Sequence, residues 1–401
     1  MAHSAAIFDP AAATAAYLAQ LPPEAHAKAQ AYTHGGHWLL LWSALVSVAV
    51  AWLLLRTGVL VRLRRRIASR RRRPWLAALA VVGAGLAIES LLVLPWNAYE
   101  HWWRERAYGL TSQGFRGWLL EALAKDLIYG LITLALMLGL YALIRRAPKR
   151  WWLWGAGATG VVFVLMLVVA PVLIQPLFNT FKPAPPGPVR DAVVALAQAN
   201  GVPSDKIVIF NGSKQSNRYT ANVSGLFGTA RVAMSDVMFA KGADMAEVRG
   251  VVGHEMGHYV HRHTLWLAGA YTLMALAAFF LVDKLFFPVL HLTGAEGVEG
   301  LADPAGMPVI GIILTVLGLL ATPLTCAITR EAESDADRFS LERAHEPDGL
   351  AKALVKTIEY RAATPSKLEE VLFYDHPAVG VRIRRCMDWK AAHLDDPAKP
   401  R

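Results

Sequence analysis

Cysteine is nearly absent from this sequence, in which Cys326 and Cys386 are the only two among 401 residues. Such a pair supplies neither a disulfide framework nor a cysteine zinc site. Charged residues are also scarce, at 18% of the chain. Residues 1–20 lack the basic start and the apolar core of a secretory signal peptide. A metal site in this protein must therefore be built from histidine and carboxylate side chains.

Apolar residues dominate what is present, at 55% of the chain with 13 tryptophans. Several stretches reach the roughly 20 apolar residues that are needed to cross a bilayer. The predicted spans cover residues 38–61, 75–95, 119–144, 151–174, 264–290 and 307–328. We therefore expect a mainly α-helical, multi-pass membrane protein in contact with the lipid bilayer, in the plasma membrane or, in a bacterium, the inner membrane.

The net charge of +10 is concentrated in short arginine-rich segments between apolar stretches, including residues 62–66, 70–73 and 145–150. Basic loops beside spans are typical of membrane topology. A nucleic-acid-binding domain would instead carry its basic residues on one soluble face. No nucleic-acid partner is expected.

The pattern between the fourth and fifth predicted spans is that of a soluble α/β domain. A proline-rich loop at residues 182–188 marks its start, and short strands are predicted at 207–210, 218–223 and 230–234. Asp244 and Glu247 are spaced as a capping box that begins a helix. The predicted organisation is a leader at 1–37, a membrane domain with four spans at 38–174, a first half of a catalytic domain at 175–263, two further spans at 264–328, and the second half of that domain with C-terminal helices at 329–401.

The helix predicted after Asp244 contains an HExxH pentapeptide, formed by His254, Glu255 and His258. Residues four apart lie on one face of a helix, so both imidazoles can bind one metal ion. The intervening glutamate can then act as general base toward a metal-activated water. Only three residues define the motif, and two solvent-facing histidines on an amphipathic helix are the alternative interpretation.

A hydrolytic zinc site usually has a third protein ligand, and the acidic segment at residues 329–337 is its most direct source. Glu333 and Asp337 lie one helical turn apart, and so do Glu331 and Asp335. One carboxylate of a pair can bind the metal while the other accepts a hydrogen bond from a ligating histidine. Spacing alone does not choose between the pairs, and a solvated acidic face also fits.

With these residues in place, the chain resembles the type I CAAX prenyl proteases, which are integral-membrane zinc endopeptidases with a zincin-like α/β catalytic domain. Residues 253–264 are similar to the family's GHExGH…HT segment, and residues 329–337 to its SRxxExxAD motif, with threonine in place of serine. Residues 376–382 resemble its HPxxxxR element. Weaker matches lie at 94–110, 176–181 and 211–214, in the same order along the chain.

The resemblance implies one zinc ion held by His254, His258 and Glu333. It also implies that Asp337 lies behind the ligands and that Glu255 is the general base. His376 and Arg382 are expected at the active site, where they stabilise the tetrahedral intermediate or hold substrate.

One segment departs from the family pattern. The family often has Asn-Ala-Tyr on an edge strand, whereas the matching positions here are Thr220, Ala221 and Asn222. Thr220 and Asn222 share a strand face, so either side chain is a candidate to contact the substrate backbone. An ordinary polar residue on an exposed strand is the alternative.

The expected function is a membrane-embedded zinc metalloendopeptidase acting on a peptide or protein substrate, which the resemblance suggests is lipidated. A heat-shock-type quality-control metalloprotease is the alternative within proteolysis. A non-enzymatic scaffold or transporter with a vestigial site is the remote one. The positive-inside rule puts the catalytic domain outside the cytoplasm, whereas the resemblance implies the cytosolic side, so orientation stays open.

Overall fold

The computed structural model describes residues 8–70, 74–226 and 228–394. Within them, six helical segments are long and apolar enough to cross a membrane, which confirms the predicted multi-pass helical fold. These segments are Pro23–Thr57, Trp75–Ala107, Phe115–Arg146, Trp151–Phe178, His263–Thr293 and Pro304–Ala344. The start of the predicted leader, residues 71–73 of the arginine-rich segment, and the last residues of the chain lie outside the described residues.

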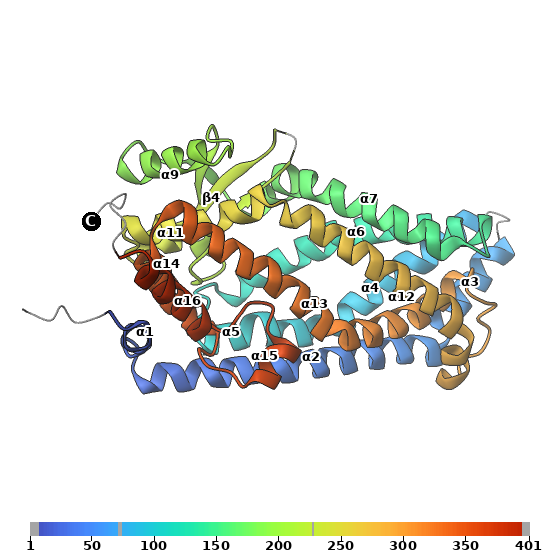
Figure 1. The fold of residues 1–401 in the computed structure, drawn as a ribbon. Coiled ribbons are helices and arrows are strands. Elements are labelled where there is room, and N and C mark those ends of the chain that lie inside the picture. Colours follow the sequence, from blue (N-terminus) through green and yellow to red (C-terminus); the bar gives the residue numbers. More distant parts are fainter. Residues whose placement is uncertain (1–7, 71–73, 227, 395–401) are drawn as a thin grey trace, which may run out of the picture.

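The long helices run side by side, and the small α/β part lies at one end of them (Figure 1). They are α2 (Pro23–Thr57), α4 (Pro74–Ala98), α6 (Phe115–Arg146), α7 (Trp151–Val169), α12 (His263–Thr293) and α13 (Met307–Ala344). The short helix α3 (Val59–Arg70) lies at the opposite end from α9 (Pro188–Ala199), α11 (Met245–Val260), α14 (Pro347–Thr357) and α16 (Val379–Ala392). We call these the basic end and the catalytic end.

The N-terminal segment differs from the predicted leader. Helix α1 (Pro10–Leu18) is capped by Asp9, whose side chain accepts a hydrogen bond from the Ala11 N–H. The Tyr17 hydroxyl donates to Asp348 at the start of α14, 2.8 Å away. Helix α2 already begins at Pro23, so part of the predicted leader belongs to the first span and part packs on the catalytic end. Ala13 and Tyr17 of α1 are partly buried against the catalytic end, which polar composition alone does not reveal.

A four-stranded sheet in the order β1-β2-β4-β3 forms one layer of the catalytic end. The strands are β1 (Phe181–Pro183), β2 (Ile207–Phe210), β4 (Arg231–Ser235) and β3 (Ala221–Ser224). β2 and β4 are parallel, and the other pairs are antiparallel. β1 lies where the sequence predicts a loop, because Pro183 is tolerated at the end of an edge strand. β3 is the other edge.

Helix α11 begins as predicted, because Asp244 and Glu247 form a complete capping box. The helix ends at Val260, and Arg262 then adopts a left-handed conformation with φ of 55°. The first membrane helix after the pentapeptide, α12, starts at the next residue, His263. The metal-binding face of α11 is therefore held directly against the beginning of a span.

Helix α13 is continuous from Met307 to Ala344. It carries a membrane span and then the acidic segment without a break at the predicted domain boundary of 328/329. α11 packs closely on it through two glycines: a Cβ on Gly253 would lie 3.0 Å from Ser340 Oγ, and one on Gly257 would lie 3.0 Å from the Ala336 backbone. This close approach brings the two halves of the candidate site together.

Candidate metal centre

Three side chains converge between α11 and α13. His254 Nε2 lies 3.2 Å from His258 Nε2 and 3.2 Å from Glu333 Oε2. His258 Nε2 lies 3.4 Å from Glu333 Oε1. Spacing alone left two acidic pairs as candidates. In the structure Glu333, from one pair, faces the histidines, whereas Glu331, from the other, is exposed.

The donor set fits a tetrahedral metal ion. Bonds of about 2.0–2.1 Å place neighbouring ligand atoms of a tetrahedron roughly 3.4 Å apart, which is close to the three separations just given. Glu333 Oε2 is buried and has no hydrogen-bond partner. A buried carboxylate oxygen left without a hydrogen bond is costly, and a cation held between it and the two imidazoles would satisfy it.

Asp337 and Arg382 lie behind His254. Asp337 Oδ1 is 2.9 Å from His254 Nδ1, so the imidazole Nδ1–H donates to the carboxylate and Nε2 is the nitrogen that faces His258 and Glu333. Arg382 donates to both oxygens of Asp337, at 2.7 and 2.6 Å, from a position with 5% exposure. The resemblance implies that Arg382 stabilises the tetrahedral intermediate or holds substrate, and that role stays a prediction. In the structure the Arg382 guanidinium binds Asp337, an arrangement that also suits a role in positioning.

The same pairing shapes the protonation of His254. Burial lowers its pKa, but the hydrogen bond with Asp337 and the nearby Glu333 carboxylate outweigh burial and raise the pKa of His254 to about 10. Metal binding therefore has to displace a proton. Burial also raises the pKa of Glu255 above its ordinary value, although His254 and His258 oppose the shift.

A second histidine pair supports His258. His263 Nδ1 lies 3.0 Å from His258 Nδ1, and His263 Nε2 lies 3.1 Å from Asp335 Oδ2. Only one of the two Nδ1 atoms can carry the hydrogen between them. With the His258 Nε2 lone pair facing the ligands, His258 Nδ1–H donates to His263, and His263 Nε2–H donates to Asp335. His261 contacts the same carboxylate, and this assignment makes the group a support for His258.

His376 approaches the centre from the C-terminal segment. Its Nε2 lies 3.2 Å from Glu333 Oε2, and its Nδ1 lies 2.7 Å from Asp375 Oδ1. Arg330, at the membrane end of the acidic segment, donates to the backbone carbonyls of Glu370 (2.7 Å) and Tyr374. Arg330 thereby holds the chain just before His376. A cavity of about 370 Å³ reaches His376 from the side of α2.

The candidate substrate residues lie at the edge of the sheet. Asn222 is on β3 opposite Ala233, and its Oδ1 is buried without a hydrogen-bond partner. Thr220 precedes the strand and is exposed. No contact joins either side chain to the described metal ligands, so a part in substrate binding stays a prediction for both.

Several supporting residues are not found by sequence reasoning. Asp375 is adjacent to His376 in sequence, and its position alone is a weak signal. Arg330 stands in the acidic motif, but its partners, the carbonyls of Glu370 and Tyr374, lie in and just after the short helix α15 (Lys367–Phe373), far along the chain. For Asp335, the spacing predicts only an alternative ligand pair with Glu331, not a contact with His263.

Two imidazoles on one helix converge with a glutamate on a membrane-spanning helix. This arrangement defines the protein as an integral-membrane metalloprotease. Residues 183–390 match the family model described as peptidase family M48. Residues 10–180 match the model described as CAAX prenyl protease N-terminal, five membrane helices. The chain belongs to peptidase family M48. This confirms the expected metalloprotease function over a scaffold or transporter.

Similar proteins share most of their length with this chain. An uncharacterized metalloprotease of Bacillus subtilis, YhfN, is 27% identical over 91% of this chain and 86% of its own length. CAAX prenyl protease 1 of Saccharomyces cerevisiae is 25% identical over 76% of this chain and 71% of its own length. The crystal structure of Ste24p from S. mikatae has the same fold, with a TM-score of 0.74, 20% identity, and coverage of 94% and 95% of the two chains.

Proposed function

We propose that the protein is a zinc-dependent endopeptidase that cleaves membrane-associated, prenylated protein substrates. The observation that supports zinc most directly is the convergence of His254 Nε2, His258 Nε2 and Glu333 with separations of 3.2–3.4 Å. Two histidines and one glutamate form a common ligand set of catalytic zinc, which leaves a coordination position open. When bound, zinc lowers the pKa of a water molecule and polarises the scissile carbonyl.

The side chains of this chain perform the remaining steps. Glu255 accepts the proton of the attacking water and passes it to the leaving amine nitrogen, so the glutamate ends as it began. In its protonated form, with Nδ1–H donated to Asp375, His376 donates a hydrogen bond from Nε2 to the carbonyl oxygen as negative charge develops there. Asp337, held by Arg382, keeps the Nε2 lone pair of His254 directed at the ligand position.

The proposed substrate class rests on the named relatives and on the sheet edge. Several relatives are CAAX prenyl proteases, and the catalytic end lies against the ends of membrane helices. An extended peptide can add to the free edge of β3 by backbone hydrogen bonds. We propose that Asn222, whose side-chain oxygen is buried without a hydrogen-bond partner, contacts that peptide.

The test combines metal quantification with cleavage assays on purified protein. We expect about one zinc ion per chain in the wild type and in Glu255→Gln, with cleavage reduced about 10²–10⁴-fold in the variant. Glu331→Gln, which changes an exposed carboxylate on α13, is the matched control and should keep full activity. A wild-type protein that binds no zinc, or an active Glu255→Gln enzyme, would contradict the proposal.

The substrate is tested with one peptide in two forms, farnesylated and unmodified, beside an unfolded membrane protein. Faster cleavage of the farnesylated form supports a prenyl-protein substrate. Equal cleavage of both forms, with degradation of the unfolded protein, would favour the quality-control function instead.

A further inference from the structure

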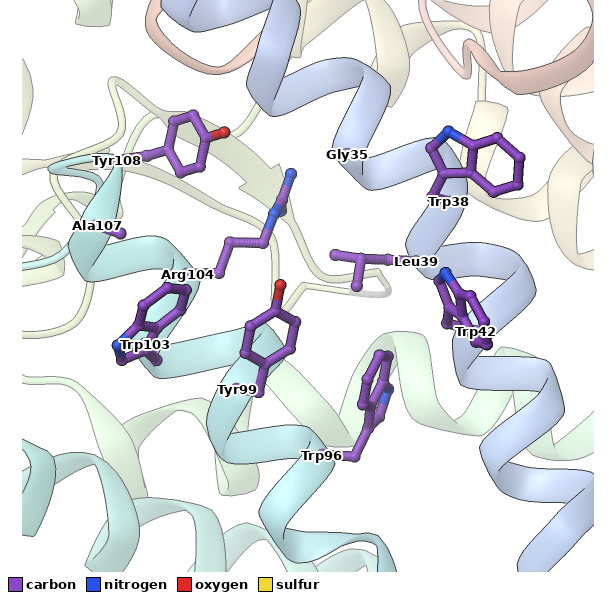
Figure 2. A pocket seen from close by; sticks show the side chains of 10 residues that line it. All are labelled: Gly35, Trp38, Leu39, Trp42, Trp96, Tyr99, Trp103, Arg104, Ala107 and Tyr108. Atoms are coloured by element: carbon purple, nitrogen blue, oxygen red, sulfur yellow. The ribbon is translucent and has the colours of Figure 1, made fainter.

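A pocket lined mainly by aromatic side chains lies between α2 and the end of the second span, away from the candidate metal ligands (Figure 2). Its volume is about 560 Å³, within the range of about 300–1,000 Å³ that is typical of small-molecule sites. We call it the aromatic pocket. Its lining residues are Gly35, Trp38, Leu39, Trp42, Trp96, Tyr99, Trp103, Arg104, Ala107 and Tyr108.

Two groups of aromatic side chains lie on opposite sides of the pocket, as Figure 2 shows, and we call them its walls. Trp38 and Trp42 lie on α2. The other wall follows the π-helix Tyr99–Trp103, where Tyr99 stacks on Trp103 with ring centroids 5.5 Å apart and also contacts Trp96. Trp38 and Trp103 are 64% and 56% exposed, so the walls open to the surroundings of the protein.

These walls are at the level of a membrane–water interface. Trp38 stands where the apolar part of α2 begins, and Trp96 stands where the apolar part of the second span ends, with Trp103 seven residues further on. Tryptophan and tyrosine are enriched at this level, because their rings are apolar and their N–H and O–H groups remain near water. The surroundings to which the pocket opens are therefore lipid headgroups and the first carbons of their chains.

Arg104 lies at one end of the pocket, and its charge has no carboxylate partner. Its side chain is buried, with 8% exposure. It donates to the Tyr32 carbonyl, and its guanidinium carbon lies 3.8 Å from the centre of the Tyr32 ring. Among the described residues no carboxylate forms an ion pair with it. The adjacent Glu105 is engaged by Arg218, at 2.6 Å, and by the Tyr32 hydroxyl.

One nitrogen of the Arg104 guanidinium donates to the Tyr32 carbonyl, and a guanidinium at the edge of a pocket has further N–H groups with which to bind an anion. Phosphate is the anion that matches its planar fork, because two N–H groups can donate to two phosphate oxygens. The aromatic walls beside it match an apolar chain. A ligand that satisfies both parts carries a phosphate and a hydrocarbon chain in one molecule.

We propose that the aromatic pocket binds an anionic phospholipid of the bilayer, with its phosphate on Arg104 and an acyl chain between the walls formed by Trp42 and Trp103. Arg104 also lines the cavity that reaches His376, so the bound phosphate lies in the wall between the lipid and the catalytic end. This site is independent of the zinc chemistry, and its test does not use peptidase activity.

The experiment measures lipid retained by the purified full chain in native mass spectrometry, after incubation with phosphatidylglycerol or phosphatidylcholine of identical acyl chains. We expect the wild type to retain phosphatidylglycerol preferentially. Arg104→Gln should lower that retention about tenfold, because a charge-assisted hydrogen bond is lost. Arg106→Gln changes an exposed arginine on the same short helix and should retain phosphatidylglycerol like the wild type.

A second variant and a second ligand keep the outcome decisive if Arg104→Gln does not fold. Trp103→Ala removes an exposed ring and should also weaken phosphatidylglycerol retention. Inorganic phosphate, added in excess, should not displace the lipid. Equal retention of the two lipids, equal losses in Arg104→Gln and Arg106→Gln, or full displacement by inorganic phosphate would each overturn the proposal.

Discussion

At the scale of single residues, the candidate centre depends on side chains that hold other side chains. His254 is oriented by Asp337, which is itself held by two hydrogen bonds from Arg382. His258 is oriented by His263, which donates to Asp335. Each imidazole therefore has one nitrogen held by a protein hydrogen bond and the other facing the metal position, so the orientation of both rings is set before any ion arrives.

We expect Asp337→Asn to lower zinc affinity about 10–100-fold, because the amide supports the His254 tautomer less well than a carboxylate does. Zinc affinity is measured by competition with a chromophoric chelator. Asp388→Asn, at an exposed residue whose carboxylate pairs with Arg384, serves as the control and should bind zinc like the wild type. Unchanged affinity in Asp337→Asn would mean that the aspartate does not position the ligand.

At the scale of elements, the site depends on how closely α11 and α13 approach. Gly257 faces the Ala336 backbone and the Phe339 side chain, each 3.0 Å from where a Cβ would lie. A larger side chain there must move α13, the helix that carries Glu333. Close helix packing and metal binding are therefore linked through one glycine.

Gly257→Val should destabilise the protein by about 1–3 kcal/mol through overpacking and should reduce its zinc content. Thermal unfolding in detergent and metal analysis measure the two effects. Gly269→Val on α12, where no atom lies within 4 Å of the new Cβ, controls for the loss of a helical glycine. Equal effects of the two substitutions would show that the close approach is not important.

The start of α11 gives a prediction about pH. Burial acts to raise the pKa of Asp244, but hydrogen bonds from Lys352 and from the Glu247 backbone outweigh burial and lower it. A lowered folded-state pKa contributes stability above the unfolded pKa of about 3.9, and this contribution is lost as the pH falls through the folded value. Asp244→Ala should cost about 1 kcal/mol near neutral pH.

Asp244→Asn separates the charge from the cap, since the amide oxygen can still accept the hydrogen bond. Its deficit in thermal stability relative to the wild type should be present at pH 6 and shrink below about pH 4. A deficit that does not change with pH would show that the carboxylate charge contributes nothing at this position.

At the scale of the whole molecule, the basic and catalytic ends differ in charge. The arginines of α3 lie at the basic end. The arginines in the last turn of α6, Arg145 and Arg146, also lie at the basic end. Their neighbours Ile144 and Trp151 pack in the same hydrophobic cluster as Leu290 of α12 and Met307 of α13. The positive-inside rule counts charges in such short loops, and both of these loops belong to one side of the membrane.

We therefore expect the basic end in the cytoplasm and the catalytic end on the opposite side, against the orientation that the family resemblance implies. Fusions of alkaline phosphatase and of green fluorescent protein to the C-terminus, which follows α16, measure the side directly. Phosphatase activity without fluorescence is the expected result in a bacterial host. A fluorescent fusion without phosphatase activity would place the catalytic end in the cytoplasm.

Much of this protein is determined by the sequence alone. Long apolar runs must be buried in lipid as helices, which predicts six spans. The HExxH spacing on a helix predicts two imidazoles on one face, and the Asp244–Glu247 pair predicts where that helix begins.

Only the tertiary structure decides how distant parts meet. Spacing leaves Glu333 and Glu331 equally good, and the packing of α13 on Gly253 and Gly257 turns Glu333 toward the histidines. The tertiary structure also brings the Arg382 guanidinium onto Asp337 and places α1 on the catalytic end. Periodicity shows which residues share a face of their own helix, but which face meets which is a property of packing between elements far apart in the chain.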